Sequence, residues 1–416
     1  MTPPERREFL KTSGLAFAAA AMGLTHKPAF TMSKQSIQSK PPDTPLPIGS
    51  EEFVKRQALA RDFMLKNKLD MILLTGGTSM KYYTGVSWGR SERTFAWLLP
   101  VDSEPIWVCP AFERDRAEER TEPNSVIRTW QEDESPFRLI TNILKQKKSS
   151  KGRLGIEETV RYFVTDGISK AAKGVKIVSA NPVINGCRGI KTTKEIGLLR
   201  YINKVTLEVI RSSVKQMKEG MTQGELSGVI SSEYVKRGLR GWALVLFGPN
   251  AAFPHGTKNH VLLSPGQLVL VDTGTSFHGY QSDISRTTIF GEPTKRQTEI
   301  WSAVKEAQSM ALEKAKPGIK AGDVDKVARS VIAKAGFGKG YSVFTHRLGH
   351  GIGMDGHEFP YLVKGNKLKL QTGMTFSNEP GIYIRGELGV RLEDIMVITK
   401  SGSELLTEPA VSLLDV

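Results

Sequence analysis

The sequence predicts two globular domains: an α/β domain with a mixed sheet, and then an α+β domain with a pseudo-two-fold internal repeat. Three observations predict this. Short apolar runs alternate with helix-like stretches over residues 51–185, the pattern changes near Gly189–Thr193, and residues 190–416 carry two copies of one motif. The chain has 416 residues, 39% hydrophobic and 24% charged, which suits two soluble domains with ample core.

Residues 51–185 are typical of a layered α/β domain, because strand-like and helix-like segments alternate along them. The expected strands are Leu69–Thr75, Pro105–Cys109, Arg153–Glu157 and Val175–Ser179, and the expected helices are Glu51–Asn67, Ala111–Glu119, Pro136–Lys147 and Thr159–Lys173. This stretch contains no Gly-rich phosphate loop and no clustered set of ligand residues. We therefore expect no chemistry in the first domain.

The second domain begins with a long expected helix, Lys194–Met217, and its repeat follows. A turn–helix–glycine unit runs from Gly220 to Gly238 and recurs from Gly318 to Gly336, and in both copies the two glycines are eighteen residues apart. Each copy then continues with a glycine and an apolar run that ends on an acid. A second acid follows in each copy, four residues after another glycine. The acids that stand in equivalent positions are Asp272 and Asp283 in the first copy and Glu379 and Glu393 in the second.

Four acids in this register predict a cation site. Asp272 ends the apolar run Gln267–Val271, and Gly279 turns the chain back so that Asp283 can meet it across a hairpin. Buried carboxylates are costly unless cations neutralise them. Four negative charges balance two divalent ions, and His350 adds a neutral ligand. These donors suit Mn²⁺ first, with Co²⁺ or Zn²⁺ as alternatives. Structural acids at strand ends are the other interpretation.

At these residues the chain resembles the creatinase/methionine-aminopeptidase superfamily, which has the pita-bread fold. The motifs that carry the resemblance are VDTG…SD, HRLGHGIG…HE, NEPG and RLED. Upstream, residues 82–93 (YYTGVSWGRSER) and 110–119 (PAFERDRAEE) resemble the N-terminal domain of the proline-specific branch, aminopeptidase P and prolidase. The resemblance implies a pita-bread domain over residues 190–416, five metal ligands, a homodimer, and cleavage of Xaa-Pro bonds by a metal-bridging hydroxide.

The resemblance also implies catalytic roles for five residues. His357 matches the position that contacts the scissile carbonyl, and His255 matches a histidine that faces substrate. His346 and Arg391 match positions for a proton shuttle and a substrate-carboxyl group, and Glu379 matches the general base beside its role as a ligand. Two alternatives stay open: a core histidine for His357, and an ion-pair partner for Arg391.

The expected partner is a peptide with proline at its second position. Whether the enzyme is a dipeptidase or an aminopeptidase stays open, because limits on peptide length depend on loops of the first domain and on dimer contacts. Two rival functions also remain: a different dimetal amide hydrolase on the same fold, and a non-catalytic binding module. Five intact ligand positions argue against the second rival.

The N-terminal residues resemble a twin-arginine export signal. Arg6 and Arg7 precede Phe-Leu-Lys and the apolar segment Gly14–Leu24, within a signal segment expected over residues 1–30. That apolar segment is too short to cross a hydrocarbon core of about 30 Å, so no stable membrane span is expected. Residues 31–50 are rich in Pro and Ser and are expected to form a linker. The expected location is periplasmic or extracellular.

The charge and the cysteines exclude other classes. The net charge of +15 is scattered along the sequence, which indicates a solvated basic surface and not a nucleic-acid interface. The two cysteines, Cys109 and Cys187, are too few and too far apart for a disulfide framework or a thiolate metal site. We expect both to be free and buried, with a single bridge as the alternative.

Overall fold

The computed structural model describes residues 44–147, 149 and 151–416, and from Pro45 onward these form one compact unit. The expected signal segment and most of the expected linker lie outside the described residues. Regular structure begins with helix α2 (Ser50–Asn67).

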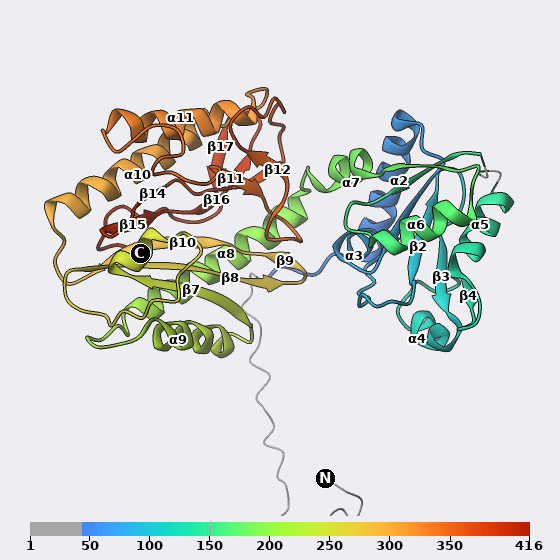
Figure 1. Ribbon diagram of the computed structural model, residues 1–416, viewed down its shortest axis with the longest axis horizontal. Coiled ribbons are helices and arrows are strands. Elements are labelled where there is room, and N and C mark those ends of the chain that lie inside the picture. The colour runs from blue at the N-terminus through green and yellow to red at the C-terminus, as the bar shows by residue number, and fades with distance from the viewer. Residues whose placement is uncertain (1–43, 148, 150) are drawn as a thin grey trace, which may run out of the picture. The chain divides into compact units, whose positions relative to one another are not determined.

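The first domain is a mixed α/β sheet, as predicted. Six strands stand in the order β4-β3-β2-β1-β5-β6, with parallel pairs at both ends and antiparallel pairs in the middle (Figure 1). The strands are β1 (Met71–Thr75), β2 (Ala96–Pro100), β3 (Ile106–Pro110), β4 (Val126–Trp130), β5 (Arg153–Ile156) and β6 (Lys176–Ser179). The helices after α2 are α3 (Thr78–Thr84), η1 (Ala111–Glu113), α4 (Arg114–Glu118), α5 (Pro136–Gln146), α6 (Tyr162–Ala171) and α7 (Asn181–Arg188).

The second domain contains two antiparallel sheets that meet near the predicted acids. One has the order β10-β8-β7 with β9 beside β8, the other has the order β12-β11-β13-β16-β17, and β14 pairs with β15. An isolated bridge between Ser285 and Glu393 connects the two sheets. The helices are α8 (Thr193–Val214), α9 (Gln223–Lys236), η2 (Gly248–Ala252), α10 (Lys295–Lys314) and α11 (Ala321–Lys334). The strands are β7 (Gly241–Phe247), β8 (Gln267–Phe277), β9 (Tyr280–Gln281), β10 (Ile284–Phe290), β11 (Gly349–Gly351), β12 (Glu358–Leu362), β13 (Thr375–Asn378), β14 (Gly381–Ile384), β15 (Leu388–Arg391), β16 (Asp394–Ile398) and β17 (Ser403–Leu405).

Strand β8 is buried on both faces, which explains its unbroken apolar run. Helices α10 and α11 lie along one side of the strands and α9 along the other (Figure 1). Leu268 of β8 packs into the core that α10 and α11 share, whereas Val269 and Val271 pack into the core of α8 and α9. A strand covered on both faces shows continuous hydrophobicity, not alternation. The strand therefore delivers Asp272 from the middle of the domain.

The internal repeat is visible in matching hydrogen bonds. The N–H of Gly220 donates to the carbonyl of Leu263 at 2.8 Å, and the N–H of Gly318 donates to the carbonyl of Leu370 at 2.8 Å. Both glycines have positive φ angles, 78° and 85°, which a residue with a side chain adopts at a cost. The two turn–helix units therefore begin in the same way.

The two halves also differ in one respect. Asp272 and Glu379 each lie nine residues beyond the leucine of the repeat, so their registers match. After α9 the first half continues into strand β7, whereas residues 337–348, all of them described, form neither helix nor strand, and β11 begins only at Gly349. The second half thus replaces a regular strand by an irregular segment.

Two further features of the described residues bear on the expectations. No helix within this part of the chain is long and apolar enough to cross a membrane. Cys109 and Cys187 are both buried and free, which confirms that prediction.

Candidate metal centre

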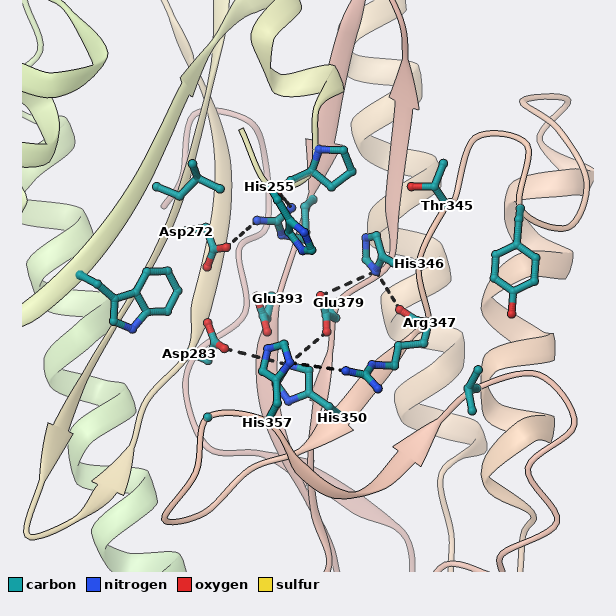
Figure 2. Close-up of a pocket in the computed structure, with 17 residues that line it drawn as sticks. His255, Asp272, Asp283, Thr345, His346, Arg347, His350, His357, Glu379 and Glu393 are labelled. Carbon is teal, nitrogen blue, oxygen red and sulfur yellow. Dashed lines mark hydrogen bonds and ion pairs between the residues drawn. The ribbon is translucent and has the colours of Figure 1, made fainter. Parts of the chain in front are cut away.

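A cavity of about 710 Å³ lies where the two halves of the second domain meet. Figure 2 shows Asp272 and Asp283 facing Glu379, Glu393 and His350 across it. All nine residues that the sequence singled out line this cavity: His255, Asp272, Asp283, His346, His350, His357, Glu379, Arg391 and Glu393. The structure therefore brings together residues separated by up to 138 positions in sequence (393 − 255).

The potential ligand atoms fall into overlapping groups. Within each group they lie within 4.8 Å of one another: Asp272, Asp283 and Glu393; His350, Glu379 and Glu393; Asp283, His350 and His357. Glu393 belongs to two groups, as do Asp283 and His350. This arrangement suits two neighbouring cations with shared carboxylates better than one cation.

The first half presents its two acids from paired strands. Asp272 on β8 stands opposite Ser285 on β10, and Asp283 directly precedes β10. At Gly274 a Cβ atom would lie 2.1 Å from the carbonyl oxygen of Ser282. Only glycine permits this close approach, which brings the chain before Asp283 against the strand that carries Asp272.

The second half supplies the other three candidate ligands, and the hydroxyls of Ser377 and Ser285 hold them. A Cβ at Gly349 would lie 2.0 Å from the carbonyl of Ser377, so this glycine lets β11 approach β13. The Ser377 hydroxyl accepts the N–H of His350 at 3.0 Å and donates to Glu379 Oε1 at 3.0 Å. Glu393 Oε2 accepts from the Ser285 hydroxyl of the other sheet at 2.8 Å. Each ligand is therefore held by protein hydrogen bonds.

The carboxylates repel one another strongly in this site. Burial, followed by the neighbouring carboxylates, raises the pKa of Asp283 and of Glu393 well above the usual range. Burial also raises the pKa of Glu379 to about 7, although Arg391 opposes it. Asp272 Oδ1 is buried and has no hydrogen-bond partner within the described part of the chain. Divalent cations relieve this repulsion and satisfy this oxygen, so the residues fit a metal centre.

His350 is set up as a neutral ligand. Burial, then the stacked ring of His357 at 3.7 Å, lowers the pKa of His350 to about 3. Its Nδ1–H donates to the carbonyl of Gly351 at 3.1 Å, which leaves the lone pair on Nε2. Nε2 lies 3.3 Å from Glu379 Oε1 and 4.0 Å from Asp283 Oδ2. Electron-rich atoms that converge in this way favour a cation between them.

Arg391 is engaged by the protein and is only 3% exposed. Its Nη2 donates to Asp272 Oδ2 at 2.6 Å, its Nε to the Ser285 hydroxyl at 2.8 Å, and its Nη1 to the Pro254 carbonyl at 3.1 Å and the Tyr383 hydroxyl at 3.2 Å. These contacts favour the ion-pair alternative for Arg391, which the sequence left open. They argue against direct contact between Arg391 and a substrate carboxyl.

His346 belongs to a chain of hydrogen bonds behind the acids. Its Nδ1 donates to the carbonyl of Arg347 at 2.8 Å, and its Nε2 accepts from the Tyr383 hydroxyl at 2.8 Å. Burial, then Arg391, lowers its pKa to about 3. Nδ1 also lies 3.8 Å from Glu379 Oε2. His346 is therefore neutral and linked to both Arg391 and Glu379.

The mouth of the cavity carries His255, His357 and a cation that sequence reasoning missed. His255 and His357 are exposed at the mouth. The partial burial of the His357 ring, followed by the charge of Arg347, lowers the pKa of His357. Arg347 Nη2 lies 3.4 Å from His357 Nδ1, and its guanidinium lies 4.4 Å from the ring of Tyr361. Within residues 44–147, 149 and 151–416, no carboxylate pairs with Arg347.

Other lining residues also escaped the sequence analysis. Trp242 and Tyr341 line the cavity and remain 47% and 44% exposed, which leaves aromatic walls open to a ligand. Arg347 had a signal in the sequence, because it stands between two singled-out histidines in HRLGHGIG. Tyr383 had none, since its hydroxyl meets His346 and Arg391 only through the pairing of β14 with β15.

Comparisons with known families match both domains. Residues 197–400 match metallopeptidase family M24, and residues 56–190 match the creatinase/prolidase N-terminal domain.

Similar proteins and structures cover nearly the same length. An Xaa-Pro dipeptidase of Lactobacillus helveticus is 36% identical over 346 residues, 81% of this chain and 92% of that protein. A dipeptidase structure from Mycobacterium ulcerans is similar with a TM-score of 0.83 and 29% identity, covering 89% of this chain and 99% of that one. An X-Pro aminopeptidase structure from Thermotoga maritima gives a TM-score of 0.70 and 26% identity, covering 82% and 96%.

Proposed function

We propose that this chain, which belongs to metallopeptidase family M24, is a dinuclear Xaa-Pro dipeptidase. Its membership makes it a metal-dependent hydrolase of peptides. The relatives include both Xaa-Pro dipeptidases and an X-Pro aminopeptidase, so the fold does not separate the two activities. The observation that favours a dipeptidase is the Arg347 guanidinium, which has no acidic partner in the described part of the chain and lines the cavity of the candidate metal centre.

A dipeptide differs from a longer peptide by a carboxylate directly on its proline. That carboxylate needs a fixed cation within reach of the reacting carbonyl. Arg391 is already engaged with Asp272, whereas the Arg347 guanidinium donates to His357 Nδ1 at 3.4 Å and lies over the ring of Tyr361. Arg347 is therefore the better candidate for holding the substrate carboxylate, and a longer peptide would leave this guanidinium without its anion.

The five residues proposed to hold two divalent ions, of which Mn²⁺ is our choice, are Asp272, Asp283, His350, Glu379 and Glu393. Ions bound there would acidify the attacking water at neutral pH and polarise the scissile carbonyl. All other steps fall to the chain's own side chains.

His357 lies at the mouth beside the metal ligand His350 and is placed to donate to the carbonyl oxygen as charge develops on it. Glu379, which lies among the candidate ligands, takes up the proton of the attacking water. His346 and the Tyr383 hydroxyl, linked to Glu379 and Arg391, return a proton to the proline nitrogen, which leaves as a secondary amine. His255 lines the substrate side of the cavity.

The test is a panel of substrates on the Mn²⁺-loaded protein. We expect Ala-Pro to be cleaved with a kcat/KM at least about 10-fold above that of Ala-Pro-amide, because a charge-assisted hydrogen bond contributes about 1.5–3 kcal/mol. Ala-Ala should be a poor substrate. Cleavage of Ala-Pro-Ala as fast as Ala-Pro would identify an aminopeptidase, and equal cleavage of Ala-Ala and Ala-Pro would identify a broader amide hydrolase.

We also propose that the protein is exported and forms a homodimer. The support for export is the arginine pair followed by the apolar segment Gly14–Leu24. The support for the dimer is the family resemblance alone, and light scattering on the purified protein tests it.

A further inference from the structure

We infer that a buried ion pair on helix α11, Asp325 with Arg329, positions the substrate-facing segment of residues 340–348. Neither residue lines the cavity. Both act on the backbone around Arg347, so the inference rests on the proposed function for its choice of substrate. Arg329 and Asp325 are 7% and 0% exposed.

All five N–H groups of the Arg329 guanidinium are used. Its Nε donates to Asp325 Oδ2 at 2.8 Å and one Nη2 proton to Asp325 Oδ1 at 3.0 Å. Its Nη1 donates to the carbonyls of Gly340 at 2.9 Å and Phe344 at 2.7 Å, and the second Nη2 proton goes to the carbonyl of His346. A guanidinium is the one side chain with five donors in a fixed plane.

Aromatic contacts and Asp325 complete the clamp. The guanidinium lies 3.9 Å from the ring centre of Tyr341, an aromatic residue of the cavity wall, and 4.3 Å from that of Phe344. Asp325 Oδ1 accepts the N–H of Leu348 at 3.0 Å. The pair therefore binds the carbonyl of His346, just before Arg347, and the N–H of Leu348, just after it.

Comparison of the two halves explains why this clamp is needed. In the first half the chain after α9 pairs as strand β7 with β8, which satisfies its backbone groups. In the second half residues 337–348 have no such strand partner. The positions on α9 that correspond to Asp325 and Arg329, counted from the repeat glycines, are Ser227 and Ser231. The ion pair thus occurs in the half that lacks a regular strand over these residues, where it supplies donors to three backbone carbonyls.

The metal ligand nearest to this segment is held by other means. His350 is fixed by the Ser377 hydroxyl and by the pairing of β11 with β12. Loosening the clamp should therefore displace Arg347, which Figure 2 shows facing the cavity, and leave the five ligands in place. The His346 ring is held separately by the Tyr383 hydroxyl at 2.8 Å. The expected signature is weaker substrate binding without loss of metal.

The test is Arg329→Lys, which keeps the charge beside Asp325 but cannot reach all three carbonyls. For Ala-Pro we expect KM to rise about 10-fold while kcat changes less, because a contact made equally in ground and transition states appears in KM. Metal content by mass spectrometry should stay at the wild-type value. The matched control is Arg237→Lys, at the C-terminal end of α9 on the other side of the strands. It alters the Arg237–Glu233 pair, four residues apart at 2.8 Å, and should leave both constants unchanged.

A double-mutant cycle separates positioning from general stability. If Arg329 acts through Arg347, then Arg329→Lys in an Arg347→Met background should cause no further loss in kcat/KM. The inference is wrong if the losses in kcat/KM of the two single variants multiply in the double variant. It is also wrong if Arg329→Lys has wild-type kinetics. If Arg329→Lys is insoluble, Asp325→Asn takes its place with the same expectations. If the wild type shows no preference for a free carboxylate, the proposed function fails, and the cycle is run on the amide that it does cleave.

Discussion

A buried acid at the start of β12 offers a sharp test of what holds the two domains together. Glu358 forms ion pairs with Arg188 at 2.6 Å, at the end of the first domain, and with Lys191 at 2.7 Å. Burial alone would raise the pKa of Glu358, but Lys191 and Arg188 hold it below the usual range. We expect the isosteric change Glu358→Gln to destabilise the protein strongly.

The magnitude follows from the burial of the partner. The Lys191 side chain is 1% exposed, so Glu358→Gln leaves an ammonium group buried without its counter-charge. Breaking one partner of a buried pair costs about 3–5 kcal/mol. The control is Glu404→Gln: Glu404 pairs with Arg200 at 2.6 Å, but the side chains are 53% and 45% exposed, so about 0–1 kcal/mol is expected.

Urea unfolding followed by tryptophan fluorescence measures both variants. Because the folded pKa of Glu358 is depressed, its contribution is complete above the unfolded pKa of about 4.3 and is lost as pH falls through the lower folded value. The wild type should therefore lose more stability below about pH 4.3 than Glu358→Gln does. Adding Lys191→Met to Glu358→Gln should recover much of the loss. A free energy of unfolding for Glu358→Gln within about 0.5 kcal/mol of wild type at pH 7 would refute the reasoning.

Four further variants test the site and the export signal. Glu379→Ala should lose metal and activity together, because it removes a ligand and the proposed base; retained metal by mass spectrometry would contradict its role as ligand. Arg391→Ala and His346→Ala should keep metal but lose about 10²-fold or more in turnover of Ala-Pro, and near-normal turnover would remove them from the proton path. Changing Arg6 and Arg7 to Lys should retain the protein in the cytoplasm, as cell fractionation would show; unchanged secretion speaks against the twin-arginine interpretation.

Much of the fold was predictable because the internal repeat is marked by short sequence patterns. Glycines with positive φ and apolar runs that end on acids depend only on neighbouring residues, so the spacing of Gly220, Gly318, Asp272 and Glu379 could be read directly. Strand β2 (AWLLP), buried at every position, was missed, because a five-residue apolar run shows no period. Strand β4 was missed as well.

The organisation behind the site was less predictable because it depends on tertiary contacts. An acid four residues before a base occurs on many helix surfaces, and nothing in the sequence shows that Arg329 points inward to bind three carbonyls. The same holds for Arg391. Its position on a strand indicated that the side chain faces the cavity, but not that the guanidinium binds Asp272 instead of a substrate. Sequence patterns locate such residues; only the fold shows which atoms they meet.

The guanidinium beside Asp272 makes the two cation positions unequal. One carboxylate oxygen of Asp272 is already bound by a permanent positive charge, whereas the ligand oxygen of Glu379 near His350 is bound by a neutral hydroxyl. Like charges repel at short range, so the position next to Asp272 should fill second as cation is added. Protein that is given one equivalent of cation would then hold its ion mainly at the other position. Activity would rise in two separate steps as the first and then the second equivalent of cation is added.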